Sequence, residues 1–253
     1  ESLEDLPIKK GVINEDGSKQ DLDITKLRLI IDEACSGVED VSADAVFELI
    51  DKNIYDGIKK EDLSSSILIS IRPLIEKDPN YSYVVARLLL TSLYEEGLTF
   101  LNFKDNAPTI KEMSKAYPEY FKSYITNAVE LELIDKELLN YDIDFIAKNI
   151  DPSKDLAFTY LGLQTLYDRY FIHKQGKRFE LPQAFFMRVA MGLAINEENR
   201  EERTLEFYNL ISSFDFMCST PTLFNSGTLR PQLSSCYLST LPDDLKGIFE
   251  GIS

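Results

Sequence analysis

Histidine, cysteine and tryptophan are scarce in this sequence of 253 residues, which has one histidine, three cysteines and no tryptophan. The odd number and wide spacing of Cys35, Cys218 and Cys236 argue against a disulfide scaffold and suit a reducing compartment. His173 has no second histidine, cysteine or carboxylate at ligand spacing. We therefore expect no zinc or iron site, and a solvated histidine at a helix end.

Long apolar runs are also missing. No run approaches the roughly 20 residues needed to cross a bilayer, and the first residues lack the order of a secretory signal. We therefore expect a cytoplasmic protein with no membrane partner. Basic residues number 27 against 43 acidic ones, which gives a net charge of −16. Because this charge repels phosphate backbones, we expect no nucleic acid partner.

Three widespread signatures are absent: the Walker loop, the Gly-x-Gly-x-x-Gly loop and the Gly-x-Ser-x-Gly elbow. What is present is a hydrophobic content of 44%, enough for a folded core in one large domain or two medium ones. No internal repeat stands out, so a helix bundle is favoured over a solenoid. Composition alone therefore predicts an acidic, mainly helical globular protein.

The first part of the chain combines a strand pair with helical spacing. The turn residues Asp16-Gly17-Ser18 predict a hairpin over residues 8–24. Thr25 and Ser42 are the expected N-caps of the first two helices, because each precedes apolar residues spaced three and four apart. A compact unit of one or two strands and four helices is expected.

The third and fourth helices of this unit are expected over residues 61–78 and 81–96. The third has to accommodate Pro73, and Gly97 is expected to stop the fourth. The polar stretch that follows predicts a domain boundary near Asp105.

Three segments follow from this boundary: residues 1–105, 106–231 and 232–253. The second segment is expected to be helical over residues 110–131, 138–150, 156–172, 182–195 and 201–214. Pro182 suits a first helical turn there. The helical spacing then breaks, because residues 218–227 have the composition of a loop and residues 233–240 that of a buried strand.

Two polar constellations lie in this last part, and the residues alone leave their meaning open. Cys236 follows two serines on the predicted strand, but a lone cysteine on a strand is usually an inert small hydrophobe. The loop that contains Thr222 and Gly227 is rich in hydrogen-bond donors and could bind phosphate, although such loops more often only turn the chain. The acidic pairs at 197–198 and 201–202 are interpreted as a solvated helix start.

The motif Ser-Thr-Pro-Thr-Leu-Phe-Asn-Ser-Gly at 219–227, followed by Gln-Leu-Ser-Ser-Cys-Tyr-Leu at 232–238, resembles the large subunit of ribonucleotide reductase. Residues 158–170 and 181–190 are similar to the helical N-terminal domain of that family, and residues 8–96 resemble its regulatory ATP-cone. The resemblance implies a mainly α fold, with an ATP-cone-like unit and a helical domain leading into the first strand of a ten-stranded α/β barrel. It also implies reduction of ribonucleoside diphosphates to deoxyribonucleotides by thiyl-radical chemistry.

The resemblance also implies roles for individual residues. Cys236 matches one half of the redox-active cysteine pair, which donates hydrogen at the 2′ carbon of the ribose. Thr222 and Ser235 match residues that hold the substrate diphosphate. Asp243, Asp244 and Leu245 match the start of the effector site, which selects the base to be reduced.

The cone-like unit departs from the chemistry of the family. Lys26 is kept, but Asn14-Glu15 stands in place of a Lys-Arg pair that holds nucleotide phosphates. Lys60 and Ser64 replace a threonine and a histidine, and Glu95 stands where a lysine is expected. Carboxylates in place of cations repel phosphate. The departure therefore predicts a degenerate cone that does not bind ATP.

The same resemblance implies the partners of the parent enzyme. They are a ribonucleoside diphosphate, a metal-containing small subunit that supplies the radical, a second large subunit, thioredoxin or glutaredoxin as reductant, and ATP or deoxynucleotide effectors with magnesium. Neither an Asn-x-Cys-x-Glu segment nor the second cysteine of the pair is present, and Cys35 and Cys218 do not match those positions. Since the chain starts at Glu1 and not at methionine, we expect a piece of a longer protein, inactive alone and without bound cofactor or metal. The alternatives are a nucleotide-sensing module and an oligomerisation module without catalysis of its own.

Overall fold

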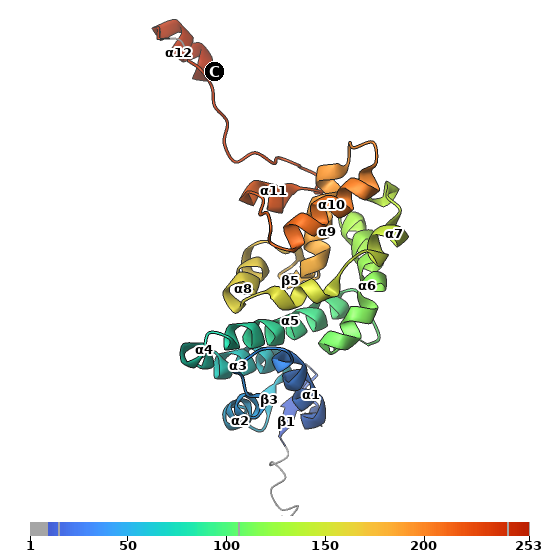
Figure 1. Ribbon diagram of the computed structural model, residues 1–253, viewed down its shortest axis with the longest axis vertical. Helices are drawn as coiled ribbons and strands as arrows, with labels where there is room; N and C mark the ends of the chain where they lie inside the picture. Colours follow the sequence, from blue (N-terminus) through green and yellow to red (C-terminus); the bar gives the residue numbers. More distant parts are fainter. Residues whose placement is uncertain (1–9, 15, 106, 242, 253) are drawn as a thin grey trace, which may run out of the picture.

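The computed structural model describes residues 10–14, 16–105, 107–241 and 243–252 (Figure 1). The predicted hairpin is confirmed within these residues: β1 (Gly11–Ile13) pairs antiparallel with β2 (Lys19–Asp21). Residues 8, 9 and 15, which the prediction also covered, lie outside the described part. A third strand, β3 (Ile58–Lys59), pairs in parallel with β1 and gives the sheet order β2-β1-β3. The sequence analysis did not predict β3, because a strand of two residues leaves no visible alternation.

Five helices complete the first unit. They are α1 (Ile24–Cys35), α2 (Ala43–Asn53), α3 (Lys60–Ile71), α4 (Leu74–Lys77) and α5 (Tyr81–Phe100). Ser42 caps α2 as predicted, since its hydroxyl accepts from the Ala45 amide at 3.2 Å. The prediction of Thr25 as the cap of α1 was wrong. Asp23 is the N-cap, because its carboxylate accepts from the Lys26 amide at 2.8 Å, and the cap therefore lies two residues earlier than predicted.

Two further predictions in this unit were wrong for physical reasons. The helix expected over 61–78 is split into α3 and α4, because Pro73 has no amide hydrogen to continue the helical pattern. The helix expected to stop at Gly97 runs on to Phe100. A β-carbon at Gly97 would lie 3.3 Å from Leu181 Cδ2, so this glycine allows a close approach of another segment and does not end the helix.

The remaining chain is also helical. It contains α6 (Ile110–Glu130), η1 (Lys136–Asn140), α7 (Ile143–Lys148), η2 (Pro152–Ala157), α8 (Tyr160–Arg169), a hairpin of β4 (His173–Lys174) and β5 (Lys177–Arg178), α9 (Pro182–Ala194), α10 (Arg200–Ser212), α11 (Thr220–Asn225) and α12 (Leu245–Ile252). The helices predicted over 110–131, 182–195 and 201–214 are confirmed, with Pro182 in the first turn of α9.

The other two predicted helices are each divided. Residues 138–150 contain the end of η1 and all of α7, which the carboxylate of Asp142 caps by accepting from the Phe145 amide. Residues 156–172 contain the end of η2 and all of α8, with extended backbone at Phe158 and Thr159 between them. His173 is exposed, as expected, but it lies on β4 and not at a helix end.

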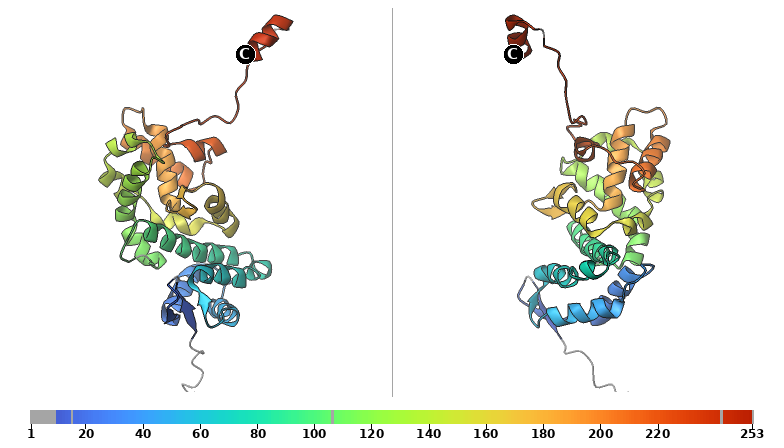
Figure 2. Two further views of the ribbon diagram at one scale, coloured as in Figure 1. Left: turned by 180° about the vertical axis from the view of Figure 1, so that it is seen from behind. Right: turned by 60° about the vertical axis from the view of Figure 1, so that its left-hand side comes forward.

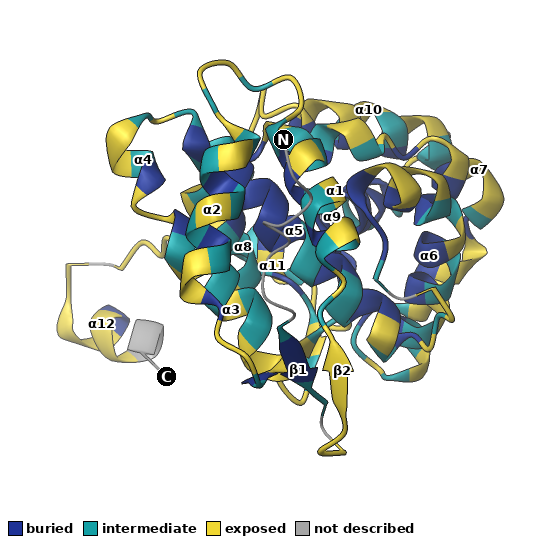
Figure 3. Ribbon diagram, turned by 90° about the horizontal axis from the view of Figure 1, so that it is seen from below, coloured by how far each residue is buried: buried dark blue, intermediate teal, exposed yellow. Residues whose placement is uncertain are grey.

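The helix α5 lies between two hydrophobic cores. Its residues Val84, Val85 and Leu88 pack into the core of the first unit, while Leu90 and Leu93 pack into the core of the second part. Figure 3 shows the buried positions of α5 in dark blue among the surrounding helices. The two parts of the chain therefore share one helix, and the division near residue 105 stays a prediction.

The strand predicted over 233–240 is not formed. These residues are extended but pair with no other strand in the described part of the chain, and most of their side chains are exposed. A strand needs a neighbour for its amides and carbonyls, and here the helix α12 follows instead. Both views in Figure 2 show this segment leaving the helical body and α12 projecting away from it. The loop predicted over 218–227 contains the short helix α11, with Pro221 in its first turn.

Candidate functional site

The helix α11 holds the beginning of the extended segment. Thr222 Oγ1 donates to the Leu233 carbonyl at 3.0 Å, and Asn225 Nδ2 donates to the Gln232 carbonyl at 2.8 Å. We call these two contacts the α11 clamp. Because the clamp fixes residues 232 and 233, the two serines and Cys236 follow directly beyond it. The structure thus brings Thr222 to the base of the segment that carries Ser235 and Cys236.

The three cysteines differ in access to solvent. Cys236 is exposed, whereas Cys35 and Cys218 are half-buried, and all three are free. Burial raises the pKa of the Cys35 thiol to about 11 and also raises the pKa of Cys218 above its ordinary value. Because a thiolate is the reactive form, burial holds Cys35 and Cys218 as unreactive thiols. The exposed thiol among the three is the one that sequence similarity singled out.

The predicted effector residues lie at the start of α12. Asp244 caps this helix, since its carboxylate accepts from the Gly247 amide at 2.9 Å. Asp243 and Leu245 are exposed. Figures 1 and 2 both place α12 at the far end of the extended segment, away from α11. The structure therefore does not bring these three residues next to Thr222.

A buried ion pair contacts the C-terminal end of α11. Arg188 on α9 and Glu180 before α9 are both fully buried, and Arg188 Nε donates to Glu180 Oε1 at 2.6 Å. Arg188 Nη1 also donates to the Ser226 carbonyl at 2.6 Å, just after the last residue of α11. Sequence reasoning missed both residues. The available signal was an arginine within the apolar run of α9, since a charge among buried residues is rarely left unpaired.

Two glycines beside this ion pair allow the backbone after α11 to lie directly against α9. A β-carbon at Gly192 on α9 would lie 2.1 Å from the Gly227 amide nitrogen. Gly227 itself has a positive φ of 74°, and its carbonyl accepts from the Asp135 amide at 2.9 Å. The chain can make this turn against α9 because neither residue has a side chain.

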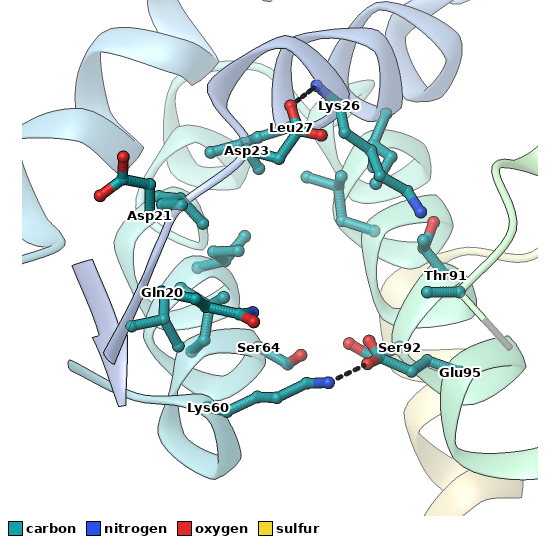
Figure 4. A pocket seen from close by; sticks show the side chains of 17 residues that line it. Gln20, Asp21, Asp23, Lys26, Leu27, Lys60, Ser64, Thr91, Ser92 and Glu95 are labelled. Atoms are coloured by element: carbon teal, nitrogen blue, oxygen red, sulfur yellow. Dashed lines mark hydrogen bonds and ion pairs between the residues drawn. The ribbon is translucent and has the colours of Figure 1, made fainter. Parts of the chain in front are cut away.

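A second candidate site is a cavity of about 260 Å³ in the first unit. Its walls are largely apolar, and Figure 4 shows polar side chains gathered at its rim. The polar residues that line it are Gln20, Asp21, Asp23, Lys26, Lys60, Ser64, Thr91, Ser92 and Glu95. The residues that the resemblance identified in the cone, apart from 14 and 15, are thus brought together. Asn14 donates to the Ser18 hydroxyl at the hairpin turn, and residue 15 lies outside the described part.

Charged side chains of both signs line this cavity. Three carboxylates, those of Asp21, Asp23 and Glu95, accompany two lysines. Lys60 Nζ lies 3.4 Å from Glu95 Oε1, so α3 and α5 are joined by an ion pair across the cavity. Figure 4 shows Lys26 reaching into the cavity in the direction of Thr91. One lysine is therefore neutralised and the other faces the cavity.

Another buried carboxyl group ties the second core together. Asp155 on η2 accepts from Tyr94 at 2.8 Å, from Tyr117 at 3.1 Å and from Gln183 Nε2 at 2.8 Å. Complete burial raises the pKa of Asp155 to about 7, although these three donors act in the opposite direction. The group joins η2 to α5, α6 and α9.

Among the residues that the structure describes, no group of three or more histidine, cysteine or carboxylate side chains is placed to hold a metal ion. No helix among these residues has the length and apolar character required to span a bilayer.

Comparison with known proteins matches two domain families. Residues 10–96 match the ATP cone domain, and residues 156–231 match the all-alpha domain of ribonucleotide reductase. The ribonucleoside-diphosphate reductase subunit alpha of Chlamydia muridarum is 41% identical over 244 residues, which cover 96% of this chain and 23% of that protein. The subunit alpha of Helicobacter pylori is 35% identical over 242 residues, covering 94% of this chain and 29% of that protein.

A more distant relative is the ribonucleoside-diphosphate reductase large subunit of Plasmodium falciparum, which is 30% identical over 244 residues, 94% of this chain and 28% of that protein. In the structure, the region that matches the ATP cone contains most of the residues lining the cavity, and α5 joins its core to the core of the remaining helical part. The chain thus combines a region that matches the ATP cone with a region that matches the all-alpha domain of ribonucleotide reductase, and 94–96% of its length is similar to ribonucleoside-diphosphate reductase large or alpha subunits. It spans about a quarter of the length of the relatives it matches.

Proposed function

We propose that this chain is part of the large subunit of a ribonucleoside-diphosphate reductase, which reduces ribonucleoside diphosphates to deoxyribonucleoside diphosphates for DNA precursor synthesis. The observation that carries the proposal is the α11 clamp. It holds the segment with Ser235 and Cys236 beside Thr222, so that phosphate-binding hydroxyls and an exposed thiol come from one short stretch. The names and matched domains of the relatives support the same function.

In this proposal Cys236 supplies reducing equivalents to the ribose. The Cys236 thiol and a second cysteine outside this chain together give two electrons and two protons. The 2′ hydroxyl leaves as water, a hydrogen takes its place, and the two sulfurs become a disulfide that thioredoxin or glutaredoxin reduces. The radical that starts the reaction comes from the metal-containing small subunit.

The substrate diphosphate lies against α11 in this proposal. Thr222 and Ser235 donate hydrogen bonds to phosphate oxygens, which offsets the cost of removing those oxygens from water. The Thr222 hydroxyl already has a partner in the Leu233 carbonyl, so binding requires this hydroxyl to rotate toward the phosphate. Asp243, Asp244 and Leu245 contribute one part of the effector site at a contact between two large subunits, where the exposed apolar side chains of α12 become covered.

Turnover of the complete protein tests the assigned roles. With the small subunit and a dithiol reductant present, Cys236→Ser is expected to abolish reduction of a ribonucleoside diphosphate, because no disulfide can form. The matched control is Cys218→Ser, which changes a half-buried thiol and leaves turnover intact. The 253 residues alone are expected to show no turnover. Equal activity of Cys236→Ser and the unchanged enzyme would remove the proposed role of this cysteine.

We further propose that the cone cavity does not bind ATP or dATP tightly. A triphosphate would bring about four negative charges to a cavity where Asp23 and Glu95 supply carboxylates and where Lys60 is already paired with Glu95. Titration calorimetry of the chain with ATP and dATP is expected to show no tight binding. Micromolar binding of either nucleotide at this cavity would refute a degenerate cone and favour a nucleotide-sensing role.

We also propose that the protein lies in the cytoplasm, where its substrate and reductants are found.

A further inference from the structure

The pair of Arg188 and Glu180 is completely enclosed by protein. Glu180 receives the Tyr124 hydroxyl and the Arg188 Nε on one oxygen, and the Ile172 amide at 2.9 Å and the Arg188 Nη2 at 3.2 Å on the other. Removing two charges from water is costly, and apolar residues of similar volume often stabilise a core at least as well. Stability alone therefore does not explain why charges occupy this place.

Beyond Glu180, the guanidinium group also donates hydrogen bonds to backbone carbonyls at the end of α11. Its Nη1 donates to the Ser226 carbonyl at 2.6 Å, and its Nη2 lies 3.4 Å from the Leu223 carbonyl. These carbonyls are at the C-terminal end of α11, where a helix leaves its carbonyls without partners. The Ser226 hydroxyl adds a bond to the Val189 carbonyl at 2.7 Å. The end of α11 is thus seated on α9 by directional contacts.

We propose that Arg188 is a positioning residue for substrate binding, which fixes α11 and, through the clamp of Thr222 and Asn225, the segment that carries Ser235. The inference rests on the proposed function, because it concerns the diphosphate of the same substrate. The planar guanidinium holds both oxygens of Glu180 and two backbone carbonyls at once. A lysine keeps the charge but cannot make this set of bonds.

Hydrogen exchange of the chain tests the structural part without any ligand. In Arg188→Lys, the hydrogen-bonded amides of Leu223, Ser226 and Thr228 are expected to exchange about tenfold faster, because loss of hydrogen bonds to a charged donor loosens α11. Arg203→Lys is the matched control, since Arg203 is an exposed arginine on α10 paired with Glu206 at 2.6 Å. Unchanged exchange in Arg188→Lys would overturn the inference.

Kinetics of the complete protein with its small subunit test the functional part. Arg188→Lys is expected to raise KM for a ribonucleoside diphosphate by about tenfold. Competitive inhibition by the matching nucleoside, which has no phosphate, is expected to stay unchanged. A merely structural role would weaken both ligands alike, and that result overturns the inference. Should Arg188→Lys fail to fold, Asn225→Ala removes the amide donor of the clamp without adding a charge, and the same selective rise in KM is expected.

These outcomes separate the inference from the proposed function. If the unchanged complete protein neither binds nor reduces ribonucleoside diphosphates, the proposed function fails, and the exchange experiment still decides whether Arg188 fixes α11. If the unchanged protein is active and Arg188→Lys has the same KM as Arg203→Lys, the proposed function stands and the positioning role of Arg188 is refuted.

Discussion

Asp155 is a carboxyl group under two opposed influences. Burial favours its neutral form, while the hydroxyls of Tyr94 and Tyr117 and the amide of Gln183 all donate to it and favour the carboxylate. Burial has the larger effect, so the pKa is raised from 3.8 to about 7. The folded chain therefore binds a proton between pH 4 and 7 that the unfolded chain has lost.

The expected consequence is a fall in stability as pH rises from about 4 to 7. Below pH 4 Asp155 is protonated in both the folded and the unfolded chain, so no buried charge lowers the free energy of unfolding. Above pH 7 both states are ionised, and the buried charge costs on the order of a few kcal/mol. Urea unfolding between pH 5 and 8 checks this, with Asp155→Asn as the variant that cannot titrate. If the difference in unfolding free energy between the two proteins is the same at every pH, the pKa is not raised.

Glu95 is the second residue whose charge has a measurable consequence. Glu95→Lys removes a carboxylate and the ion pair with Lys60, and adds an ammonium at the rim of the cavity. ATP is expected to bind this variant at least about tenfold more tightly than the unchanged chain, a change of about 1.4 kcal/mol. Both partners of the pair are substantially exposed, so folding is expected to tolerate the change.

Calorimetry with ATP measures this change directly. Glu48→Lys is the control, because it makes the same change of charge on α2 at a residue that does not line the cavity. A similar gain in both variants would mean that net charge, and not the position of Glu95, decides the affinity.

At the scale of elements, spacing in the sequence predicted the long helices and failed where polar caps or tertiary contacts decide. The helices α6, α9 and α10 were predicted to within two residues at each end. From the sequence alone, Gly97 is expected to end a helix. Its actual role, which is to let Leu181 approach α5 closely, depends on a residue more than eighty positions away. The strand over 233–240 was predicted from composition, which says nothing about whether a partner strand is present.

The contact between Gly192 and Gly227 gives a prediction at the same scale. Gly192→Ala is expected to destabilise the chain by about 3 kcal/mol, because a β-carbon would overlap the backbone at Gly227. Gly162→Ala is the matched control on the exposed side of α8, where the β-carbon meets Thr159 Oγ1 at 3.4 Å. That change is expected to be neutral or to stabilise by about 0.5–1 kcal/mol. Thermal unfolding of both variants measures the difference in stability. Equal melting temperatures would contradict the close contact between Gly192 and Gly227.

The candidate site was predictable as far as local motifs reach. The structure joins the two motifs through the bond from Thr222 Oγ1 to the Leu233 carbonyl, and the roles assigned to Thr222, Ser235 and Cys236 stay predictions. The supporting contacts from Arg188 could not be predicted, because they join segments that are 35 to 38 positions apart through backbone carbonyls, which carry no sequence signal.

At the scale of the whole molecule, α5 makes the two cores interdependent. Val85 packs into the first core and Leu90 into the second, although they are five positions apart on one helix. We expect the chain to unfold in one cooperative transition. Leu90→Ala is expected to lower the unfolding free energy by about 2–5 kcal/mol. Val85→Ala should shift the same transition. Two separate transitions, each moved by only one of these variants, would show that the cores are independent.

The exposed segment between the clamp and α12 also determines where the chain can be cut. Tyr237 and Leu238 are 69% and 99% exposed and stand in extended backbone, the form that proteases bind. Trypsin has no lysine or arginine to attack between Pro231 and Leu245, whereas chymotrypsin can cleave after Tyr237. A single nick there leaves the thiol of Cys236 on the helical body and releases α12 with the effector residues. Limited digestion can thus separate the part of the chain proposed to do chemistry from the part proposed to choose the substrate.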